Sequence, residues 1–332
     1  MSTPMTAAAP AAMRPLQYLP IGLFGAVMGL SGLSSAWRLA HVHSGAPAWI
    51  GQVVGAIAVV VFVVLLAAYA TKAILSPSTA LGEFRHPVAG NLFGTLIISF
   101  LLVPMIVAPV APLLAQALWV VGAIAMILFA WHIVDRWMND LQQPEHATPA
   151  WIVPVVGMLD VPLAMPVLDL PPELQFLRLL GLAVGLFFAV PIFTLVLSRL
   201  IFQPPLPPAL QPTLLILLAP FSVGVSTYAV TVGRVDTFSE ALFLLALFVL
   251  AVLVGRLRFL LRCCPFRVGW WAVSFPLSSM VIAAFRVAQA NPGWATDGLA
   301  WVLLLASSLV MAWMLVRTLS GVFRGELKNL VG

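Results

Sequence analysis

Charged residues are scarce in this sequence. Asp, Glu, Lys and Arg together make up 8% of its 332 residues, whereas soluble domains contain about 25%. Hydrophobic residues account for 62% of the chain, and the mean hydropathy is +1.09. A chain with so few polar groups cannot cover a water-exposed surface, so the composition indicates a polytopic membrane protein.

Cysteine is also rare in the sequence, and the common catalytic motifs are absent. The two cysteines, Cys263 and Cys264, are adjacent in a basic segment, which excludes a disulfide framework and indicates reduced thiols. No HExxH, GxSxG or phosphate-binding glycine loop occurs. The five histidines are scattered over loops and helix ends, and the HxH pair has no carboxylate near it in the sequence: His41, His43, His86, His132 and His146. We therefore expect no catalytic residue, no metal site and no cofactor.

Long apolar runs are what the sequence does contain. Ten of them approach the ~20 residues that a bilayer-crossing helix needs. We predict spans at 16–37, 48–71, 87–108, 112–134, 149–167, 174–201, 210–232, 237–261, 266–286 and 298–322. The fifth is the least regular because prolines and acids interrupt its second half. The predicted organisation is all-α: a mobile cytoplasmic tail (1–15), a ten-helix transmembrane pore domain (16–322) and a short cytoplasmic C-terminal tail (323–332).

The basic residues are distributed unequally between the two sides of this arrangement. With ten spans, the tails and even-numbered loops carry 12 of them: Arg14, Lys72, Arg85, Arg136, Arg199, Arg256, Arg258, Arg262, Arg267, Arg317, Arg324 and Lys328. The other side carries 4: Arg38, Arg178, Arg234 and Arg286. The positive-inside rule then places both termini in the cytoplasm. Because these residues separate apolar runs instead of forming one stripe, nucleic acid is excluded as a partner.

Prolines recur at the starts of the odd-numbered spans. Pro20, Pro87, Pro149, Pro212 and Pro265 lie 67, 62, 63 and 53 residues apart. Proline is tolerated at the start of a helix, where its missing N–H has no partner in any case. A period of this length predicts a helical hairpin used five times, and five such units form a quasi-five-fold ring with one helix of each pair inside.

Small and hydroxylic residues mark one face of each odd-numbered span. They are spaced by three or four residues and so share a helix face. Such residues also serve simply for close packing between membrane helices, but their occurrence in all five odd spans favours a common pore. The predicted pore-lining residues are Gly25, Gly29, Thr95, Ser99, Gly157, Gly224, Thr227, Pro276 and Ser279.

The ninth span, FRVGWWAVSFPLSSMVIAAF, carries features that a plain lipid anchor does not need. Pro276 follows Phe275 at its midpoint, and a proline there removes a backbone donor and bends the helix. Ser274, Ser278 and Ser279 surround this bend. We predict that this span lines the pore.

Four segments together resemble the tellurite-resistance/dicarboxylate transporter family, which includes TehA-like bacterial proteins and the slow-type anion channels of plants. They are LPIGLFGAVMGLSGLSSAW, the HPV at residues 86–88, LAPFSVGVSTY and WWAVSFPLSSM. The resemblance covers nearly the whole chain. It implies five hairpins around a central pore, a homotrimer with one pore per subunit, and a phenylalanine in the ninth helix that plugs the pore, which is Phe275 here.

The predicted function is an anion channel of the bacterial inner membrane for small monovalent anions such as chloride and nitrate. A pore with almost no fixed charge and many hydroxyl donors suits such ions, whereas rings of carboxylates mark cation pathways. Asp160 does not fit this pattern, because an acid within the membrane is costly and is a candidate for function. A salt bridge to Arg286 or a helix break near the outer surface would make it structural. Facing the pore, it would favour the alternative, a proton-linked dicarboxylate (malate or succinate) or tellurite-related carrier.

Overall fold

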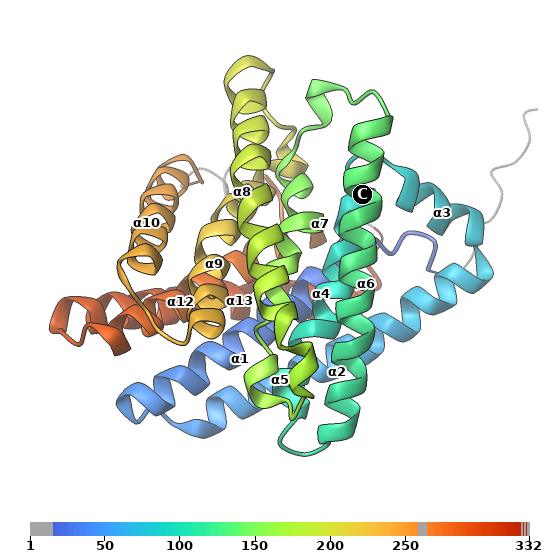
Figure 1. Cartoon of the computed structure of the whole chain (residues 1–332). Helices are drawn as coiled ribbons and strands as arrows, with labels where there is room; N and C mark the ends of the chain where they lie inside the picture. The colour runs from blue at the N-terminus through green and yellow to red at the C-terminus, as the bar shows by residue number, and fades with distance from the viewer. Residues whose placement is uncertain (1–15, 258–263, 327, 329, 331–332) are drawn as a thin grey trace, which may run out of the picture.

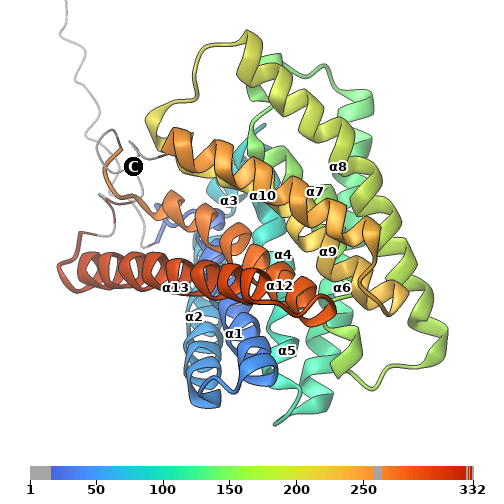
Figure 2. The same ribbon diagram turned by 90° about the vertical axis from the view of Figure 1, so that its left-hand side faces the viewer.

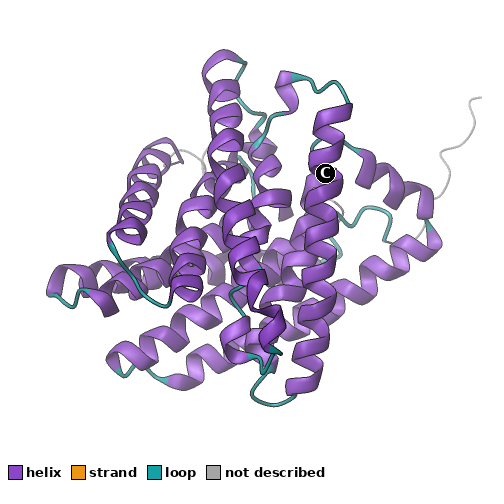
Figure 3. Cartoon of the chain, in the orientation of Figure 1, coloured by secondary structure: helices purple, strands orange, loops and turns teal. Residues whose placement is uncertain are grey.

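A computed structural model of the chain describes residues 16–257, 264–326, 328 and 330. All the regular secondary structure in these residues is helical (Figure 3). The tail at 1–15, Cys263 and two arginines of the basic cluster before the ninth span, Arg258 and Arg262, lie outside the described residues, so the expectations for them stay predictions.

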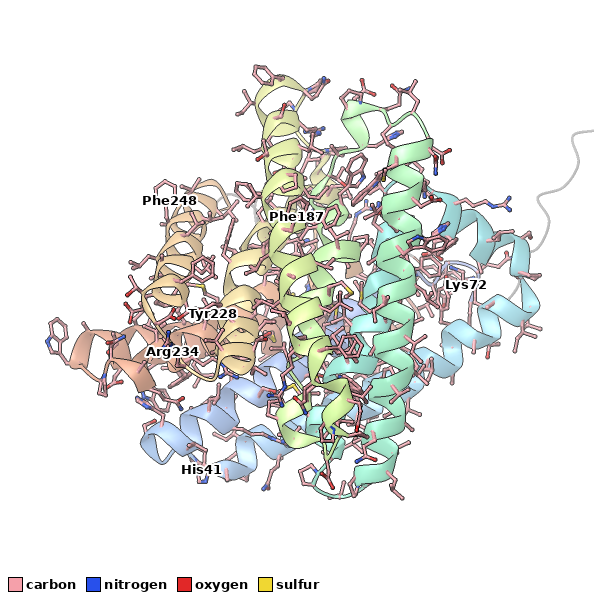
Figure 4. The ribbon with its side chains drawn as sticks, viewed as in Figure 1. His41, Lys72, Phe187, Tyr228, Arg234 and Phe248 are labelled. Atoms are coloured by element: carbon pink, nitrogen blue, oxygen red, sulfur yellow. The ribbon has the colours of Figure 1, made fainter. Side chains whose placement is uncertain are left out.

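Five long α-helices form the outer part of the described chain. Their apolar faces are largely uncovered, with between 28% and 39% of each central window buried. Phe187 and Phe248, labelled in Figure 4, are 70% and 67% exposed on two of these helices. Large apolar side chains in such positions require lipid around them. The five are α2 (Ala48–Leu75), α6 (Pro112–Asn139), α8 (Phe176–Phe202), α10 (Thr237–Leu257) and α13 (Trp294–Phe323).

Five other segments alternate with them, and each begins as a 3₁₀-helix before it becomes α-helical. Proline is the first residue of two of these segments and lies one to three residues before the other three. Proline is tolerated at a helix start because the N–H that it lacks would have no partner there. The segments are η1 (Ile21–Phe24) with α1 (Gly25–Ser44), η2 (Ala89–Leu92) with α4 (Phe93–Leu102) and α5 (Pro104–Val107), η4 (Pro149–Trp151) with α7 (Ile152–Val156) and η5 (Gly157–Asp160), η8 (Pro208–Leu218) with α9 (Ala219–Val232), and η9 (Val268–Val273) with α12 (Ser274–Ala290).

These five segments are the buried ones. In four of them between 61% and 83% of the central window is buried, and α1 buries thirteen of its twenty residues. Short helices join the elements: α3 (Pro77–Arg85), η3 (Pro144–His146), η6 (Met165–Val167) and η7 (Pro172–Gln175). The fifth predicted span, Pro149–Val167, is indeed the most irregular, because it is assembled from four short helical pieces.

Nine helical segments in the described residues are long and apolar enough to cross a membrane. They correspond to the second to tenth predicted spans, and each end lies within six residues of its predicted position. The first predicted span, 16–37, is a helix over Ile21–Ser44. Its glycines and serines make it less apolar than the other nine segments. It is sheltered from lipid by its neighbours, so it needs less hydrophobicity than an outer helix.

Each buried segment packs against the long helix that follows it. The pairs are α1 with α2, α4 with α6, α7 with α8, α9 with α10, and α12 with α13. Figures 1 and 2 show the first and last of these pairs as antiparallel hairpins. The buried segments also contact one another in the order α1, α4, α7, α9, α12 and back to α1. The C-terminal ends of α6, α8 and α10 lie on the same side of the molecule, at the top of Figure 1.

A buried polar cluster fixes the start of the first helix. Glu83 of α3 accepts hydrogen bonds from the Ile21 backbone N–H at 2.7 Å, the Tyr69 hydroxyl at 2.9 Å and Lys72 Nζ at 2.6 Å. Lys72, labelled in Figure 4, also donates to the Leu19 carbonyl at 2.6 Å. A carboxylate at a helix N-terminus satisfies a free backbone donor and interacts well with the helix dipole. The cluster therefore anchors the segment that carries Gly25.

Candidate functional site

Two cavities lie among the buried segments. The first, which we call the Asp160 cavity, has a volume of about 270 Å³. The first halves of all five buried segments surround it, and its walls are mostly apolar. The second, the Arg286 cavity, has a volume of about 240 Å³ and lies between the later parts of α1, α9 and α12, with residues near the end of α4 and at 163–167. The five buried segments thus enclose space at two levels.

Phe275 and Val223 line both cavities. The Phe275 side chain is 6% exposed, and Val223 is equally enclosed. Phe275 is the second residue of α12, directly after the 3₁₀-helical η9, and Pro276 follows it. The cavities therefore meet at an apolar barrier made of one aromatic ring and one valine.

The structure places five of the predicted pore-lining residues at these cavities. Gly25, Thr95, Gly157 and Pro276 line the Asp160 cavity, and Ser279 lines the Arg286 cavity. They come from four of the five buried segments, so residues far apart in the sequence surround common space.

The other four predicted residues lie in contacts between helices. Gly29 packs directly on the Ser274 side chain, and Gly224 faces Leu186 of α8 and Leu242 of α10. Ser99 and Thr227 are fully buried and are bonded to backbone carbonyls. One turn beyond the cavity-lining Gly25 and Thr95, the helices converge, and small side chains there permit close packing.

Most hydroxyl groups that we expected to serve an anion are bonded to the protein backbone. Thr95 Oγ1 donates to the Leu92 carbonyl at 2.7 Å and Ser279 Oγ to the Pro276 carbonyl at 3.0 Å. Carbonyls in 3₁₀-helical and proline-containing turns lack regular partners, and nearby hydroxyls satisfy them. Ser226 differs, because its buried hydroxyl has no hydrogen-bond partner and it lines the Arg286 cavity.

Asp160 is the last residue of η5 and is 2% exposed. Its Oδ1 has no hydrogen-bond partner, and no ion pair in the described part of the chain includes it. The salt bridge to Arg286 that we considered is therefore not formed, since Arg286 lines the other cavity. The helix break of the second alternative is present, because η5 ends at Asp160 and turns follow it, but the Asp160 side chain is buried beside the Asp160 cavity.

Three arginines line the cavities. Arg267 lies at the Asp160 cavity, while Arg38 and Arg286 line the Arg286 cavity. Arg38 Nη1 donates to the Met105 carbonyl at 2.9 Å, and Arg286 Nε has no partner. Within the described residues, Asp160 is the one acidic side chain lining either cavity. From the sequence these arginines served to predict orientation, and Arg286 was also considered as an ion-pair partner of Asp160. All three lie at the ends of the first or the ninth predicted span, which were expected to line a pore.

The histidines contribute to loop structure. His43 Nε2 lies 2.7 Å from Asp297 Oδ1, and His41 Nδ1 lies 2.7 Å from the Ala46 carbonyl oxygen. The HxH pair therefore does have a carboxylate neighbour, supplied by α13 from the far end of the sequence. No group of three or more His, Cys, Asp or Glu side chains in the described ranges is arranged to hold a metal ion.

Comparison with known proteins gives a consistent match over nearly the whole chain. The family model for SLAC1, described as a voltage-dependent anion channel, matches residues 18–319. The chain is 28% identical over 316 residues to the S-type anion channel SLAH3 of Arabidopsis thaliana, covering 92% of this chain and 48% of that protein. It is also 28% identical to the guard cell S-type anion channel SLAC1 of Arabidopsis thaliana, of which it covers 56%.

A bacterial relative is matched along almost its full length. The chain is 27% identical over 318 residues to the tellurite resistance protein TehA homolog of Haemophilus influenzae, covering 93% of this chain and 92% of that protein. The chain spans about half the length of the plant relatives.

Proposed function

This chain belongs to the SLAC1 family of voltage-dependent anion channels, and we propose that it conducts small monovalent anions, chloride and nitrate, through a pore closed by Phe275. The family consists of channels and transporters and not of enzymes. The nine apolar helical segments make the chain an integral, multi-pass membrane protein. The observation that carries the proposal is the pair of cavities separated by the Phe275 ring.

In this proposal the ten helical segments form five hairpins around one pore. The cyclic order of contacts among α1, α4, α7, α9 and α12 supports a closed inner ring. The predicted residues at the cavities then line the pore. Gly29, Ser99, Gly224 and Thr227 contribute to the ring through packing between helices. The two cavities are the two vestibules of this pore.

Phe275 closes the pore by bulk and by dewetting. An ion passing an apolar ring must leave its hydration shell, and this is prohibitive where no polar group replaces the lost water. The barrier is short, because Val223 is the only other described residue that lines both cavities. A rotation of one side chain or a small shift of α12 would therefore connect the vestibules.

The charges near the vestibules favour anions. Arg38 and Arg286 at one vestibule and Arg267 at the other raise the local concentration of anions at low salt. The names of the plant relatives, S-type anion channels, agree with this selectivity.

A second candidate function rests on Asp160. An enclosed carboxylate without an ion-pair partner, facing a cavity, is a group that could carry a coupled proton. The chain would then be a proton-linked dicarboxylate carrier, for malate or succinate, or a tellurite-related carrier. The name of the Haemophilus influenzae relative, a tellurite resistance protein, supports this alternative.

We further propose a homotrimer with one pore per subunit, in a bacterial inner membrane with both termini cytoplasmic. The arginine-rich side of the predicted topology would face the cytoplasm.

The test of function is current recorded from the purified protein in planar bilayers under a gradient of choline chloride or choline nitrate. A channel gives a current that reverses near the equilibrium potential of the anion. Absence of current, together with uptake of malate or succinate that depends on a proton gradient, would contradict the channel and establish the carrier.

A further inference from the structure

A third cavity lies on the outer part of the molecule, away from Phe275. It has a volume of about 490 Å³ and is formed by the C-terminal end of α6, the segment 142–151 and the last three turns of α8. None of the residues lining it lines either central cavity.

Arg199 is the feature of this cavity that calls for an explanation. It is 7% exposed, and its Nε and Nη1 atoms have no hydrogen-bond partner. No ion pair in the described part of the chain includes it. A buried guanidinium without a counter-charge is strongly unfavourable, because its lost hydration is not replaced. Its position indicates that an anion completes the site.

A second unsatisfied donor faces the same cavity. The Trp151 side chain is buried, and its Nε1 has no hydrogen-bond partner. Its ring stacks on Trp137 with centroids 5.3 Å apart, which holds the indole in place. Gln142, Gln203 and Ser198 add further polar groups to the lining. The acidic residues that are near in sequence, Asp140 and Glu145, do not line the cavity.

The site lies where a membrane-spanning helix ends. Arg199 is three residues before Phe202, the last residue of α8, and Phe202 and Leu195 beside it are exposed apolar side chains. The ends of α6 and α8 lie together at the top of Figure 1. Tryptophan is enriched at this depth of a bilayer, at the level of the lipid headgroups. Basic pockets between helices on the cytoplasmic side are suited to anionic headgroups.

We propose that this cavity is a binding site for a phosphate group, with Arg199 and Trp151 Nε1 as its principal donors. The phosphate is carried by an anionic lipid headgroup or is free in the cytoplasm. A guanidinium can donate to two phosphate oxygens at once, which strengthens the binding and fixes the orientation of the phosphate. An occupied site would join α6, the 142–151 segment and α8, outside the ion pathway.

The test measures thermal unfolding of the full chain in detergent. One arm adds dihexanoyl phosphatidylglycerol, with dihexanoyl phosphatidylcholine as the baseline; the other adds inorganic phosphate in place of chloride at constant ionic strength. The variants are Arg199→Met, which removes the charge, and Trp151→Phe, which keeps the stacked ring and removes one donor. The matched control is Arg85→Gln, because Arg85 is an exposed arginine on α3 outside the cavity.

For the parent and Arg85→Gln we expect the Tm to rise with ligand concentration, because a ligand that binds the folded state stabilises it. Arg199→Met should lose at least tenfold in affinity, as the loss of a charged hydrogen bond does. Without ligand, Arg199→Met should unfold at the parent's Tm or above it, because an unpaired buried charge is gone. Trp151→Phe should weaken the response by a smaller factor.

A response to phosphatidylglycerol identifies the lipid as the source, and a response to inorganic phosphate alone identifies the free ion. The proposal is wrong if neither ligand raises the parent's Tm, or if Arg199→Met and Trp151→Phe both respond as the parent does.

Discussion

Asp160 is the residue whose chemistry separates the two candidate functions. Its carboxyl group is enclosed beside the central cavity and has no ion-pair partner among the described residues. An ionised acid at this position repels the anions that the proposed channel conducts. A protonated acid does not, and it provides a group through which transport could be coupled to protons.

Asp160→Asn keeps the size of the side chain and removes both the charge and the titratable proton. For a channel we expect the variant to conduct at least as well as the parent, with a severalfold gain at low salt, and with little dependence on pH. The measurement is bilayer current between pH 5 and 8 at two salt concentrations.

The opposite result is equally clear. If the parent takes up malate or succinate under a proton gradient and the folded Asp160→Asn variant does not, Asp160 is a coupling residue and the carrier is correct. Size-exclusion chromatography of both proteins controls for folding.

At the scale of elements, the contact between α1 and α12 holds the proposed gate in place. Gly29 lies directly on Ser274, and the Ser274 hydroxyl donates to the Gly25 carbonyl at 2.9 Å. A methyl group at position 29 would meet the Ser274 side chain and lie 3.2 Å from its backbone carbonyl carbon. Because backbone cannot move aside as a flexible side chain can, the two helices would have to separate.

Gly29→Ala should therefore destabilise the protein by about 1–3 kcal/mol, the usual cost of overpacking. Gly255→Ala in α10 is the matched control, because a methyl group there meets nothing within 4 Å. The control should be neutral or stabilising by up to about 1 kcal/mol, since alanine favours helix over glycine. Thermal unfolding in detergent compares them. Equal Tm values for Gly29→Ala and the parent would contradict this close packing.

The helical elements were largely predictable from the sequence. Apolar runs of membrane length identified nine segments that the structure has as helices, because lipid leaves a chain no other way to satisfy its backbone. Four of the five predicted prolines lie at a 3₁₀-helical start of a buried segment or up to three residues before one, and Pro212 lies inside η8.

The cavity-lining face was predicted only in part. The spacing of three or four residues assumes 100° per residue, whereas the 3₁₀-helical stretches turn by 120° and rotate the following face. Gly25 and Thr95, near the starts, line the Asp160 cavity, while Gly29 and Ser99 one turn later are in packing contacts. Arg199 gave no local signal beyond its charge, because its cavity is assembled from three separate segments.

At the scale of the whole molecule, the 12 to 4 distribution of basic residues predicts the orientation. Reporter fusions at Asn139 and Lys328 should read cytoplasmic, and a fusion near Pro292 should read external. The shared side of the C-terminal ends of α6, α8 and α10 is consistent with this arrangement (Figure 1). A cytoplasmic reading at Pro292, or an external one at Asn139, would contradict the ten-span topology.

In the proposed function, the two cavities form one pore through the molecule only if the barrier between them can be removed. Phe275 and Val223 are the described residues shared by the two cavities, and Phe275 has by far the larger side chain. Its truncation should leave the ring of helices intact, because α12 is held by the Ser274 and Ser222–Ser279 hydrogen bonds as well as by packing.

The most direct measurement is therefore single-channel and macroscopic anion current from Phe275→Ala, beside Phe275→Leu and the parent, in the same bilayer and salt gradient. We expect Phe275→Ala to raise the anion conductance many-fold, with expression and oligomeric state unchanged, since water can then wet the constriction. Phe275→Leu should stay mostly closed, because it retains apolar bulk. A folded Phe275→Ala protein that conducts no better than the parent would contradict the assignment of Phe275 as the gate.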